Sequence, residues 1–506
     1  MTALGFPQLL HLVLPEVIVV VAALCVLAAD LVFMRAAETR IRGAVGAVIS
    51  VAGCAVAIGW MLHAPQYANV LDGMLVLTPL SQLVQIALLV LTILTILISL
   101  GSSFTEHMGE YLALILLATA SMMFLVGTQN LLMIFLSLEL LSLSLYILAA
   151  FNKRSAVSAE AGLKYFLFGG MSAAFLLFGF SLLYGWSNST NLAGIAQSIH
   201  GKLLNPALNP VLDPLLVVAI LMTVVGLGFK VAAVPFHFWA PDVYQGAPAP
   251  SAGFIASGSK VAAFFILYQV MVLGLAGAEG SGAWHAYAPG WVPVLALAAA
   301  LSMVLGNLVA IRQTSVRRLL AYSAIAHAGY MLLGILSHTQ QSLAALLYYA
   351  ITYALTVLGA FGVVALVEQE AGGDKLSEFA GLSHRAPVLS FCMLIFMLSL
   401  AGIPPLAGFF GKFYLFSAVL AATPGSLGLL WLVVLAIAMS AVSLYYYLQV
   451  LKRIYVADAP EGAGPISVPF LRQAVLGLIA LSVVLLGCAP DLLLRWLQQA
   501  IQTAGY

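Results

Sequence analysis

The feature that most constrains this chain is a series of long apolar runs that contain almost no charge. Hydrophobic residues make up 63% and charged residues 7% of its 506 positions. A typical soluble domain carries about 25% charged residues, so this chain lacks the charges that a water-exposed surface needs. The composition excludes a soluble enzyme, a nucleic-acid-binding protein and a disordered chain. It indicates an all-α polytopic membrane protein, because unbroken apolar runs replace the alternation expected of a membrane barrel.

The apolar runs are long enough to predict membrane-spanning helices. A span needs about 20 mostly apolar residues, and lipid offers no partner to a free backbone N–H or C=O, so each span is expected to be helical. Separating the runs at polar and Gly- or Pro-rich breaks predicts 14 spans in one membrane domain. They cover residues 9–33, 43–62, 80–101, 110–127, 131–150, 162–185, 214–239, 251–275, 292–311, 318–337, 342–368, 387–421, 427–451 and 470–489.

The basic residues predict the orientation, because cytoplasmic loops carry an excess of Lys and Arg. If the spans alternate in direction, 13 of the 19 basic residues flank loops on one side and only 2, Lys202 and Arg495, lie on the other. The remaining 4 are within spans: Lys164, Lys230, Lys260 and Lys412. This asymmetry predicts that both termini face away from the cytoplasm.

The seventh and twelfth predicted spans contain prolines that should interrupt their helices. Pro235 follows Lys230 in the seventh, and Pro404 and Pro405 precede Lys412 in the twelfth. Because the two spans are five apart, the units 110–275 and 292–453 would have opposite topology. Paired interrupted spans are typical of inverted-repeat transporters with a site at mid-membrane. The alternative is that the prolines are ordinary kinks of membrane helices.

Four buried charges form the main candidate site: Glu139, Lys230, Lys260 and Lys412. A charge at mid-membrane costs about 2.5–3.5 kcal/mol on insertion scales, so each should find a partner or lose its charge. Desolvation lowers the pKa of a buried ammonium group, and a nearby carboxylate raises it again. A lysine under both influences can gain and lose a proton near neutral pH. We therefore expect a proton relay. A static ion pair between Glu139 and Lys230 is the alternative.

Three further side chains are candidates for a supporting role. His327 lies mid-span, where an imidazole could bridge Lys260 and Lys412; it could equally be a packed, hydrogen-bonded core residue. His237, beside the break in the seventh span, has the same two interpretations. Lys164, at the start of the sixth span, could assist proton uptake or simply extend its amine to the membrane interface.

The remaining polar and aromatic groups carry weaker signals. Glu16 and Asp30, nearer the ends of the first span, are expected at the membrane interface, and Tyr445–Tyr447 are expected to pack or to form an aromatic belt. No glycine-rich nucleotide loop and no cysteine cluster with iron–sulfur spacing occurs in the sequence. The sequence therefore predicts no metal or cofactor bound by this chain.

Two segments carry a family resemblance. Ser315–Tyr330 (SVRRLLAYSAIAHAGY) and Ala401–Phe413 (AGIPPLAGFFGKF) resemble the antiporter-like membrane subunits of respiratory complex I, the proton-pumping NADH:quinone oxidoreductase. Glu160–Phe166 (EAGLKYF) resembles the N type of these subunits. The resemblance extends over the whole chain, including the two interrupted spans. One departure is that Pro235 follows its lysine, whereas Pro404 and Pro405 precede theirs.

The resemblance implies a proton-translocating subunit of a bacterial inner-membrane complex, without a redox centre of its own. It implies Glu139 and Lys230 as a charge pair, Lys260 as the central relay group and Lys412 as the terminal lysine. Sibling membrane subunits and a redox arm would be its partners, and NADH, FMN, iron–sulfur clusters and a quinone would be bound by the complex rather than by this chain. A subunit of a multi-subunit cation/proton antiporter is the alternative, because that family shares these motifs.

Overall fold

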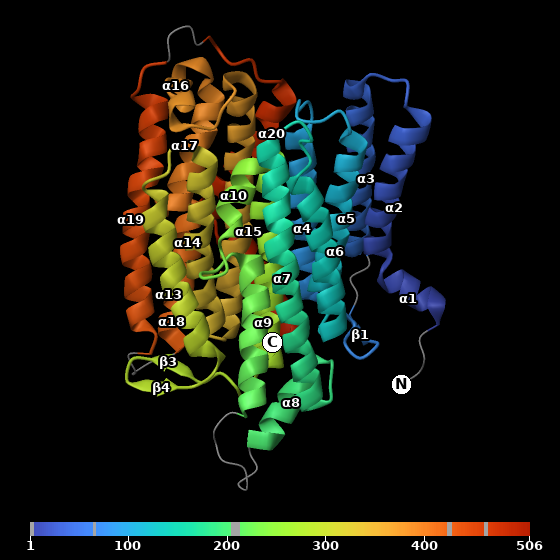
Figure 1. Ribbon diagram of the computed structural model, residues 1–506, viewed down its shortest axis with the longest axis vertical. Coiled ribbons are helices and arrows are strands. Elements are labelled where there is room, and N and C mark those ends of the chain that lie inside the picture. The colour runs from blue at the N-terminus through green and yellow to red at the C-terminus, as the bar shows by residue number, and fades with distance from the viewer. Residues whose placement is uncertain (1–4, 64–66, 204–212, 423–427, 460–463, 506) are drawn as a thin grey trace.

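The apolar runs form helices that lie side by side along the long axis of the molecule (Figure 1). The computed structural model describes residues 5–63, 67–203, 213–422, 428–459 and 464–505. Within these ranges, 13 helices are long and apolar enough to cross a membrane. Their bounds are α2 (Leu14–Ala28) continued by η1 (Ala29–Phe33), α3 (Thr39–His63), α4 (Pro79–Ser99), α5 (Met108–Val126), α6 (Leu131–Ala149), α7 (Ala156–Ser187), α9 (Pro214–Val231), α11 (Ala249–Ala256) with α12 (Gly258–Tyr268) and η2 (Gln269–Gly274), α13 (Trp291–Ala310), α14 (Val316–Leu336), α15 (Gln340–Ala371), α19 (Leu430–Tyr455) and α20 (Phe470–Cys488).

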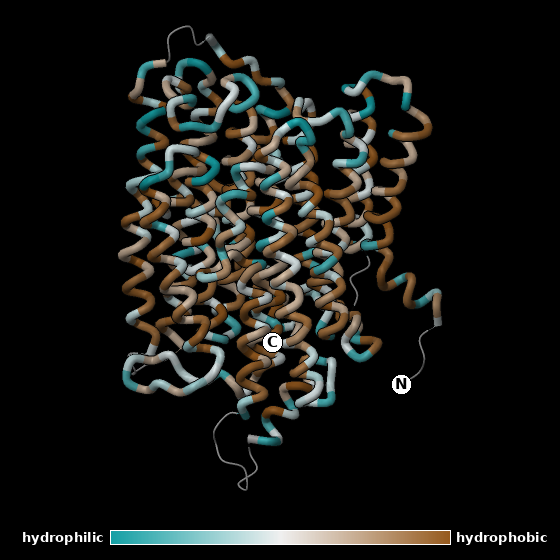
Figure 2. The backbone as a smooth tube through the Cα atoms, in the orientation of Figure 1, coloured by the Kyte–Doolittle hydropathy of each residue, from teal (hydrophilic) through white to brown (hydrophobic). Residues whose placement is uncertain are grey.

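Short elements that hydropathy did not predict lie mainly between the long helices. They are α1 (Phe6–Leu12), α8 (Leu192–Leu203), α10 (Trp239–Gly246), η3 (Leu376–Phe379), α16 (Leu382–Arg385), α21 (Asp491–Ala504) and two antiparallel hairpins, β1 (Ala68–Val70) with β2 (Leu75–Leu77) and β3 (Ser281–Ala283) with β4 (Ala286–Ala288). One end of the bundle carries α16, and the other carries α8 and both hairpins (Figure 1). Figure 2 shows mostly hydrophobic colour through the middle of the bundle and hydrophilic colour in the connections at both ends.

Polar residues fix where several of the helices begin. The side chains of Asn130, Ser155 and Ser315 each accept a hydrogen bond from a backbone N–H in the first turn of α6, α7 and α14, respectively. Thr78 and Thr339 do the same for α4 and α15. These caps satisfy N–H groups that a helix start otherwise leaves unpaired, and they explain why the spans begin at these positions.

The predicted interruptions of the seventh and twelfth spans are present, and they share one backbone geometry. α9 ends at Val231 with Ala232 in the left-handed conformation, and α17 (Pro387–Ala401) ends with Gly402 in the same conformation. In each break the next residue donates its N–H to a carbonyl five residues earlier: Ala233 to Gly228 and Ile403 to Leu398. This is the hydrogen-bond pattern of a Schellman cap. The chain resumes as α10 and as α18 (Ala407–Ala422).

The eighth predicted span is also interrupted, which the sequence analysis did not predict. α11 ends at Ala256, Ser257 leaves the helical conformation with φ −107° and ψ −86°, and α12 begins at Gly258. No proline marks this position. The signal that could have identified it is the Ser-Gly pair, which is a common cause of helix kinks. The kink places Lys260 in the first turn of a new helix.

The most deeply buried helices are those that carry polar residues at mid-span. In the most apolar 18-residue stretch of each span, the buried share of residues is 94% for Ala249–Gly274, Val316–Leu336 and Gln340–Ala371. The same share is 33% for Leu14–Phe33 and Thr39–His63. Helices α11, α12, α14 and α15 therefore form the centre of the bundle, with the other helices around them.

We predict that Gly408→Ala destabilises the twelfth span. A Cβ at this position would meet the backbone carbonyl oxygen of Ser399 across the break, and neither backbone segment can yield without moving α18 against α17. Overpacking of this kind costs about 1–3 kcal/mol, so the protein purified in mild detergent should unfold at a lower temperature. Gly477→Ala in α20 is the matched control, because its Cβ would have no atom within 4 Å. Equal unfolding temperatures for the two variants would contradict the close approach.

Candidate functional site

Lys412 lies in α18 and is buried, with 5% of its surface exposed. Its Nζ donates to the carbonyl oxygens of Leu400 at 3.0 Å and Ala401 at 3.1 Å, and to Ser440 Oγ at 2.9 Å. Leu400 and Ala401 are the last two residues of α17, where the helix leaves its carbonyls without intrahelical partners and its dipole is negative. The break in the twelfth span thus supplies the acceptors that a buried ammonium needs.

Lys260 is also buried and depends on a backbone carbonyl. Its Nζ donates to the carbonyl oxygen of Ala324 at 2.6 Å and lies 5.7 Å from the ring centroid of Tyr353. Ala324 belongs to α14, one turn before His327. Lys260 therefore contacts the helical turn that carries His327 rather than the imidazole itself.

His327 is held by two tyrosine hydroxyls. Its Nδ1 is 2.6 Å from the hydroxyl oxygen of Tyr349 in α15, and its Nε2 is 3.1 Å from that of Tyr447 in α19. The Tyr447 hydroxyl also pairs with Ser323 Oγ. Among the hydrogen bonds described, none joins His327 directly to Lys260 or Lys412, so the predicted bridge requires intermediate groups.

A second group of polar side chains leads from the same region towards Lys412. The Tyr446 hydroxyl donates to Asn307 Oδ1 at 3.0 Å, and Asn307 Nδ2 donates to the Tyr330 hydroxyl at 3.0 Å. The Tyr330 ring centroid lies 5.2 Å from Lys412 Nζ and 5.7 Å from the His327 ring. Tyr330 therefore packs against both groups that the sequence analysis expected to exchange a proton.

Lys230 lies in the last turn of α9 and donates to Ser142 Oγ in α6. Its Nζ is also 5.9 Å from the Tyr146 ring centroid. Glu139 is half-buried one turn before Ser142, next to the exposed side chains of Leu136 and Leu140. No ion pair of 4.0 Å or less joins Glu139 to Lys230 in the described residues; the two groups interact by longer-range coulombic attraction. The direct partner of Lys230 is thus the Ser142 hydroxyl, which in turn donates to the carbonyl oxygen of Leu138.

Lys164 takes part in an ion-pair network at the end of the bundle. Its Nζ lies 2.7 Å from Glu160 Oε1 and 2.7 Å from Asp242 Oδ2, and Arg318 Nη1 lies 2.8 Å from Asp242 Oδ1. Asp242 is therefore shared by a lysine of α7 and an arginine of α14. The interpretation in which Lys164 merely extends into the interface does not account for these contacts.

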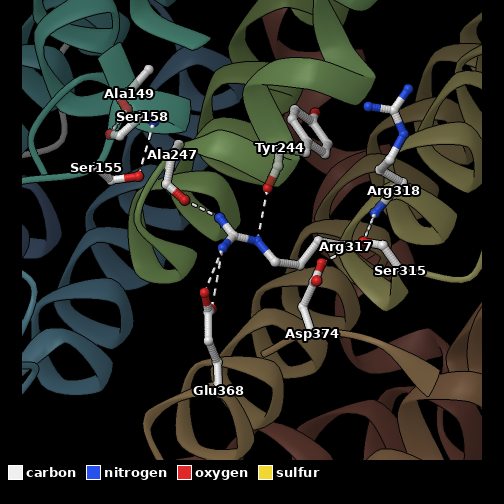
Figure 3. A network of polar contacts seen from close by, with 10 residues as sticks. All are labelled: Ala149, Ser155, Ser158, Tyr244, Ala247, Ser315, Arg317, Arg318, Glu368 and Asp374. Carbon is white, nitrogen blue, oxygen red and sulfur yellow. Dashed lines mark hydrogen bonds and ion pairs between the residues drawn. The ribbon is translucent and has the colours of Figure 1, made fainter. Parts of the chain in front are cut away.

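Arg317 fastens the end of α10 to two long helices (Figure 3). It is 4% exposed. Its guanidinium donates to the carbonyl oxygens of Tyr244 (at 3.0 Å) and Ala247, and to both carboxylate oxygens of Glu368 at 3.0 and 3.1 Å. Figure 3 shows Arg317 extended between Glu368 and α10, whereas Arg318 points the other way. A cavity of about 600 Å³ lies beside this network, lined in part by Arg154, Gln245 and Gln369.

His237 lies in the segment that follows α9 but apart from these contacts. It is 4% exposed and stacks on Phe238 with a centroid distance of 4.5 Å, and its buried Nδ1 has no hydrogen-bond partner in the described part of the chain. Pro235 lies in the same break, and Pro404 and Pro405 lie in the break after α17, as predicted. The structure does not bring His237 into contact with any of the buried lysines through a described hydrogen bond.

The sequence analysis missed the hydroxyl groups that hold the basic residues. Tyr446 and Tyr447 pack inside the bundle, which is one of the two predicted interpretations, and Tyr445 is 55% exposed. The hydrogen bonds of the two buried hydroxyls were not predicted. Ser142 and Tyr349 were not identified at all. Tyr and Ser are common in apolar helices, so only their spatial relation to His327 and Lys230 distinguishes them.

The site chemistry is that of charged and hydroxyl groups rather than of metal ligands. Among the residues that the structure describes, no group of three or more His, Cys, Asp or Glu side chains could hold a metal ion. The relay candidates carry amines, imidazoles, hydroxyls and the half-buried carboxylate of Glu139, all of which can donate, accept or carry a proton.

Comparison with known proteins gives a consistent result. Residues 128–440 match the family described as NADH:quinone oxidoreductase/Mrp antiporter, transmembrane. The chain is 56% identical to NADH-quinone oxidoreductase subunit N 2 of Acidobacterium capsulatum, over 98% of this chain and 100% of that protein. It resembles a chain of respiratory complex I from Thermus thermophilus with bound aureothin: the TM-score is 0.74 and the sequence identity 33%, over 95% of this chain and 98% of that chain. It shares its fold with a chain of the Mrp complex from Dietzia: the TM-score is 0.77 and the sequence identity 20%, over 97% of this chain and 98% of that chain.

We predict that Tyr447→Phe lowers the thermal stability of the protein. The change removes the hydroxyl that contacts His327 Nε2 and Ser323 Oγ and leaves buried polar groups without a partner, which costs about 1–3 kcal/mol. The unfolding temperature in mild detergent measures this loss. Tyr445→Phe is the matched control, because the neighbouring ring is exposed. If both variants unfold at the same temperature, the Tyr447 hydroxyl does not hold His327 as described.

Proposed function

Because the chain belongs to the NADH:quinone oxidoreductase/Mrp antiporter transmembrane family, we propose that it is an N-type, antiporter-like membrane subunit of a bacterial NADH–quinone oxidoreductase that translocates protons. The observation that carries the proposal is the series of basic residues, Lys230, Lys260, His327 and Lys412, held inside the bundle by hydroxyl and carbonyl groups. Such groups are costly within a membrane and mark proton or ion pathways there.

In the proposed mechanism, Glu139 and Lys230 form the input of the relay. A nearby carboxylate favours the protonated form of an ammonium, so a shift of Glu139 towards or away from Lys230 changes how firmly Lys230 holds its proton. Electron transfer in partner subunits would cause that shift. Ser142, which accepts from Lys230, follows Glu139 by three residues in α6, so both partners of Lys230 would come from neighbouring turns of one helix.

The central part of the relay runs from Lys260 through His327 to Lys412. His327 reaches neither lysine by a described hydrogen bond, so we propose that Tyr349 and Tyr447, or water beside them, complete the proton path. Lys412 would be the terminal group, able to release its proton because carbonyl and hydroxyl oxygens hold it without an ion-paired carboxylate among the described residues. His237 and Lys164 would support the relay from the break after α9 and from the ion-pair network around Asp242.

We propose that this relay is built from two inverted five-helix units, 110–275 and 292–453. The support is that the breaks after α9 and α17 have the same capping hydrogen bonds. The two units are not equivalent residue for residue, because Lys230 precedes the left-handed residue of its break and Lys412 follows the corresponding Gly402 by ten positions. The lysines would therefore serve different steps.

The proposed partners are the other membrane subunits of the complex and its redox arm. The outer faces of α6 and α7 expose large apolar side chains, including Leu136, Leu163 and Phe166, which suit contact with lipid or with another apolar subunit. NADH, FMN, iron–sulfur clusters and the quinone would be bound by the complex, and this chain would have no redox centre of its own. The positive loops would face the cytoplasm and both termini the opposite side.

We predict that Lys230→Ala and Glu139→Ala reduce proton pumping by the assembled complex. Each change removes one partner of the proposed input, so proton uptake into inverted membrane vesicles should fall several-fold, whereas NADH oxidation with a water-soluble electron acceptor should not change. Lys153→Ala is the control, because Lys153 lies on an exposed connection. Undiminished pumping per electron in an intact complex would refute the relay assignment.

The alternative, a subunit of a multi-subunit cation/proton antiporter, shares the fold. Purification of the chain in mild detergent separates the two proposals. Iron–sulfur and flavin subunits should accompany it if it belongs to an oxidoreductase, and their replacement by a set of antiporter subunits would favour the alternative.

A further inference from the structure

A buried carboxyl group lies outside the relay, in the N-terminal helices. Glu16 is in the first turn of α2 and is 1% exposed. Its Oε1 accepts a hydrogen bond from Gln85 Nε2 at 2.9 Å, and the same amide donates to the carbonyl oxygen of Met123 at 3.0 Å. Its Oε2 is buried and has no hydrogen-bond partner in the part of the chain that the structure describes. Glu16 therefore lies near the start of its span and is buried there, where its hydrogen bond joins α2 to α4.

A small cavity of about 10 Å³ lies against this carboxyl group. Its other lining residues are uncharged: Leu12, Pro15, Trp60, Met61, Leu77, Gln82 and Gln85. Trp60 Nε1 is buried there without a partner among the described residues, like Glu16 Oε2. A volume of this size holds about one water molecule, and a buried water needs at least two polar partners. The two buried polar atoms, Glu16 Oε2 and Trp60 Nε1, are the groups that such a water would contact.

The surroundings of Glu16 do not supply a described cation. Several elements pack against α2. At the end of α2 that holds Glu16, their titratable side chains are His11 of α1 and His63 of α3, and the His11 ring meets the Trp60 indole edge-on. At the other end are Asp30, Arg40, Arg42 and Glu110. Arg42 pairs with Asp30 at 2.6 Å, so its charge is already matched. No ion pair involving Glu16 occurs in the described ranges.

These facts determine the protonation state. The N-terminal position in α2 favours an ionised carboxylate, but the helix dipole contributes less than the desolvation of a fully buried charge. One amide donor satisfies only one of the two carboxylate oxygens. A neutral acid removes the buried charge, and its Oε2–H can donate into the cavity.

We propose that Glu16 is a second proton-binding site of this subunit, separate from the relay, which exchanges its proton with water at the end of the bundle that carries β1, β2 and α8. The ligand is a proton, held as a carboxylic acid between Gln85 and the Trp60 cavity. The proposal is independent of the proposed relay, because it depends on contacts among the elements from α1 to α5, none of which carries a relay residue.

The test uses the intact complex in native membranes, treated with the apolar reagent dicyclohexylcarbodiimide, which modifies protonated carboxyl groups in apolar surroundings. We expect a mass-spectrometric adduct on Glu16 that is strong at mildly acidic pH and weakens at least tenfold at alkaline pH. Asp30, which is paired with Arg42, is the internal control and should not be modified. Glu16→Gln should lose the adduct and should keep the complex assembled, because the amide has the shape of the neutral acid.

Infrared spectroscopy separates a charged Glu16 from one that the reagent cannot reach. The spectrum of the wild-type complex minus that of Glu16→Gln should show a carboxylic-acid C=O band that shifts in heavy water. A carboxylate band in its place, with no adduct on Glu16 at any pH, would overturn the proposal. The relay is tested by the pumping of Lys230→Ala and Glu139→Ala, and the Glu16 site by the adduct and the infrared band, so the failure of either proposal can be recognised separately.

Discussion

The interaction on which the rest of the structure depends is the hydrogen bond between a buried ammonium group and an oxygen supplied by a neighbouring helix. A lysine at mid-membrane is costly unless such acceptors are present. The end of a helix supplies them most directly, because its last carbonyls have no intrahelical partner, although a mid-helix carbonyl can accept a second hydrogen bond, as Ala324 does from Lys260. Lys412 is satisfied by the last carbonyls of α17, which are free only because the helix ends there. The break after α17 thus supplies two of the three acceptors of the Lys412 ammonium group.

The three lysines meet this requirement in different ways, which gives them different roles. Lys412 has two carbonyls and a serine, Lys260 has one carbonyl of α14, and Lys230 has the Ser142 hydroxyl with Glu139 farther away. Of the three, Lys230 alone has a carboxylate near enough to modulate it in the part of the chain that the structure describes. This asymmetry agrees with a relay that receives its signal at Lys230 and passes it towards the other two lysines.

Much of the fold could be predicted from the sequence, because hydropathy and proline report directly on helix length and helix interruption. The spans, the breaks near Pro235 and Pro404 and the buried lysines follow from such local signals. The kink at Ser257 was missed because hydropathy does not register it. The contact of Tyr447 with His327 was missed because it joins residues 120 positions apart. Glu139 was correctly placed within a span, but its position beside exposed leucines depends on which face of α6 packs inward.

The most direct test of the central claim is the number of protons pumped per electron in liposomes that contain the complete complex with Lys260→Met. Methionine keeps the length and apolar stem of the side chain but cannot hold a proton. If the buried amines carry protons, the ratio should fall below that of the wild-type complex, and Lys260→Arg should behave differently from methionine because it keeps the charge. A Lys260→Met complex that assembles fully and pumps as many protons per electron as the wild type would contradict the account.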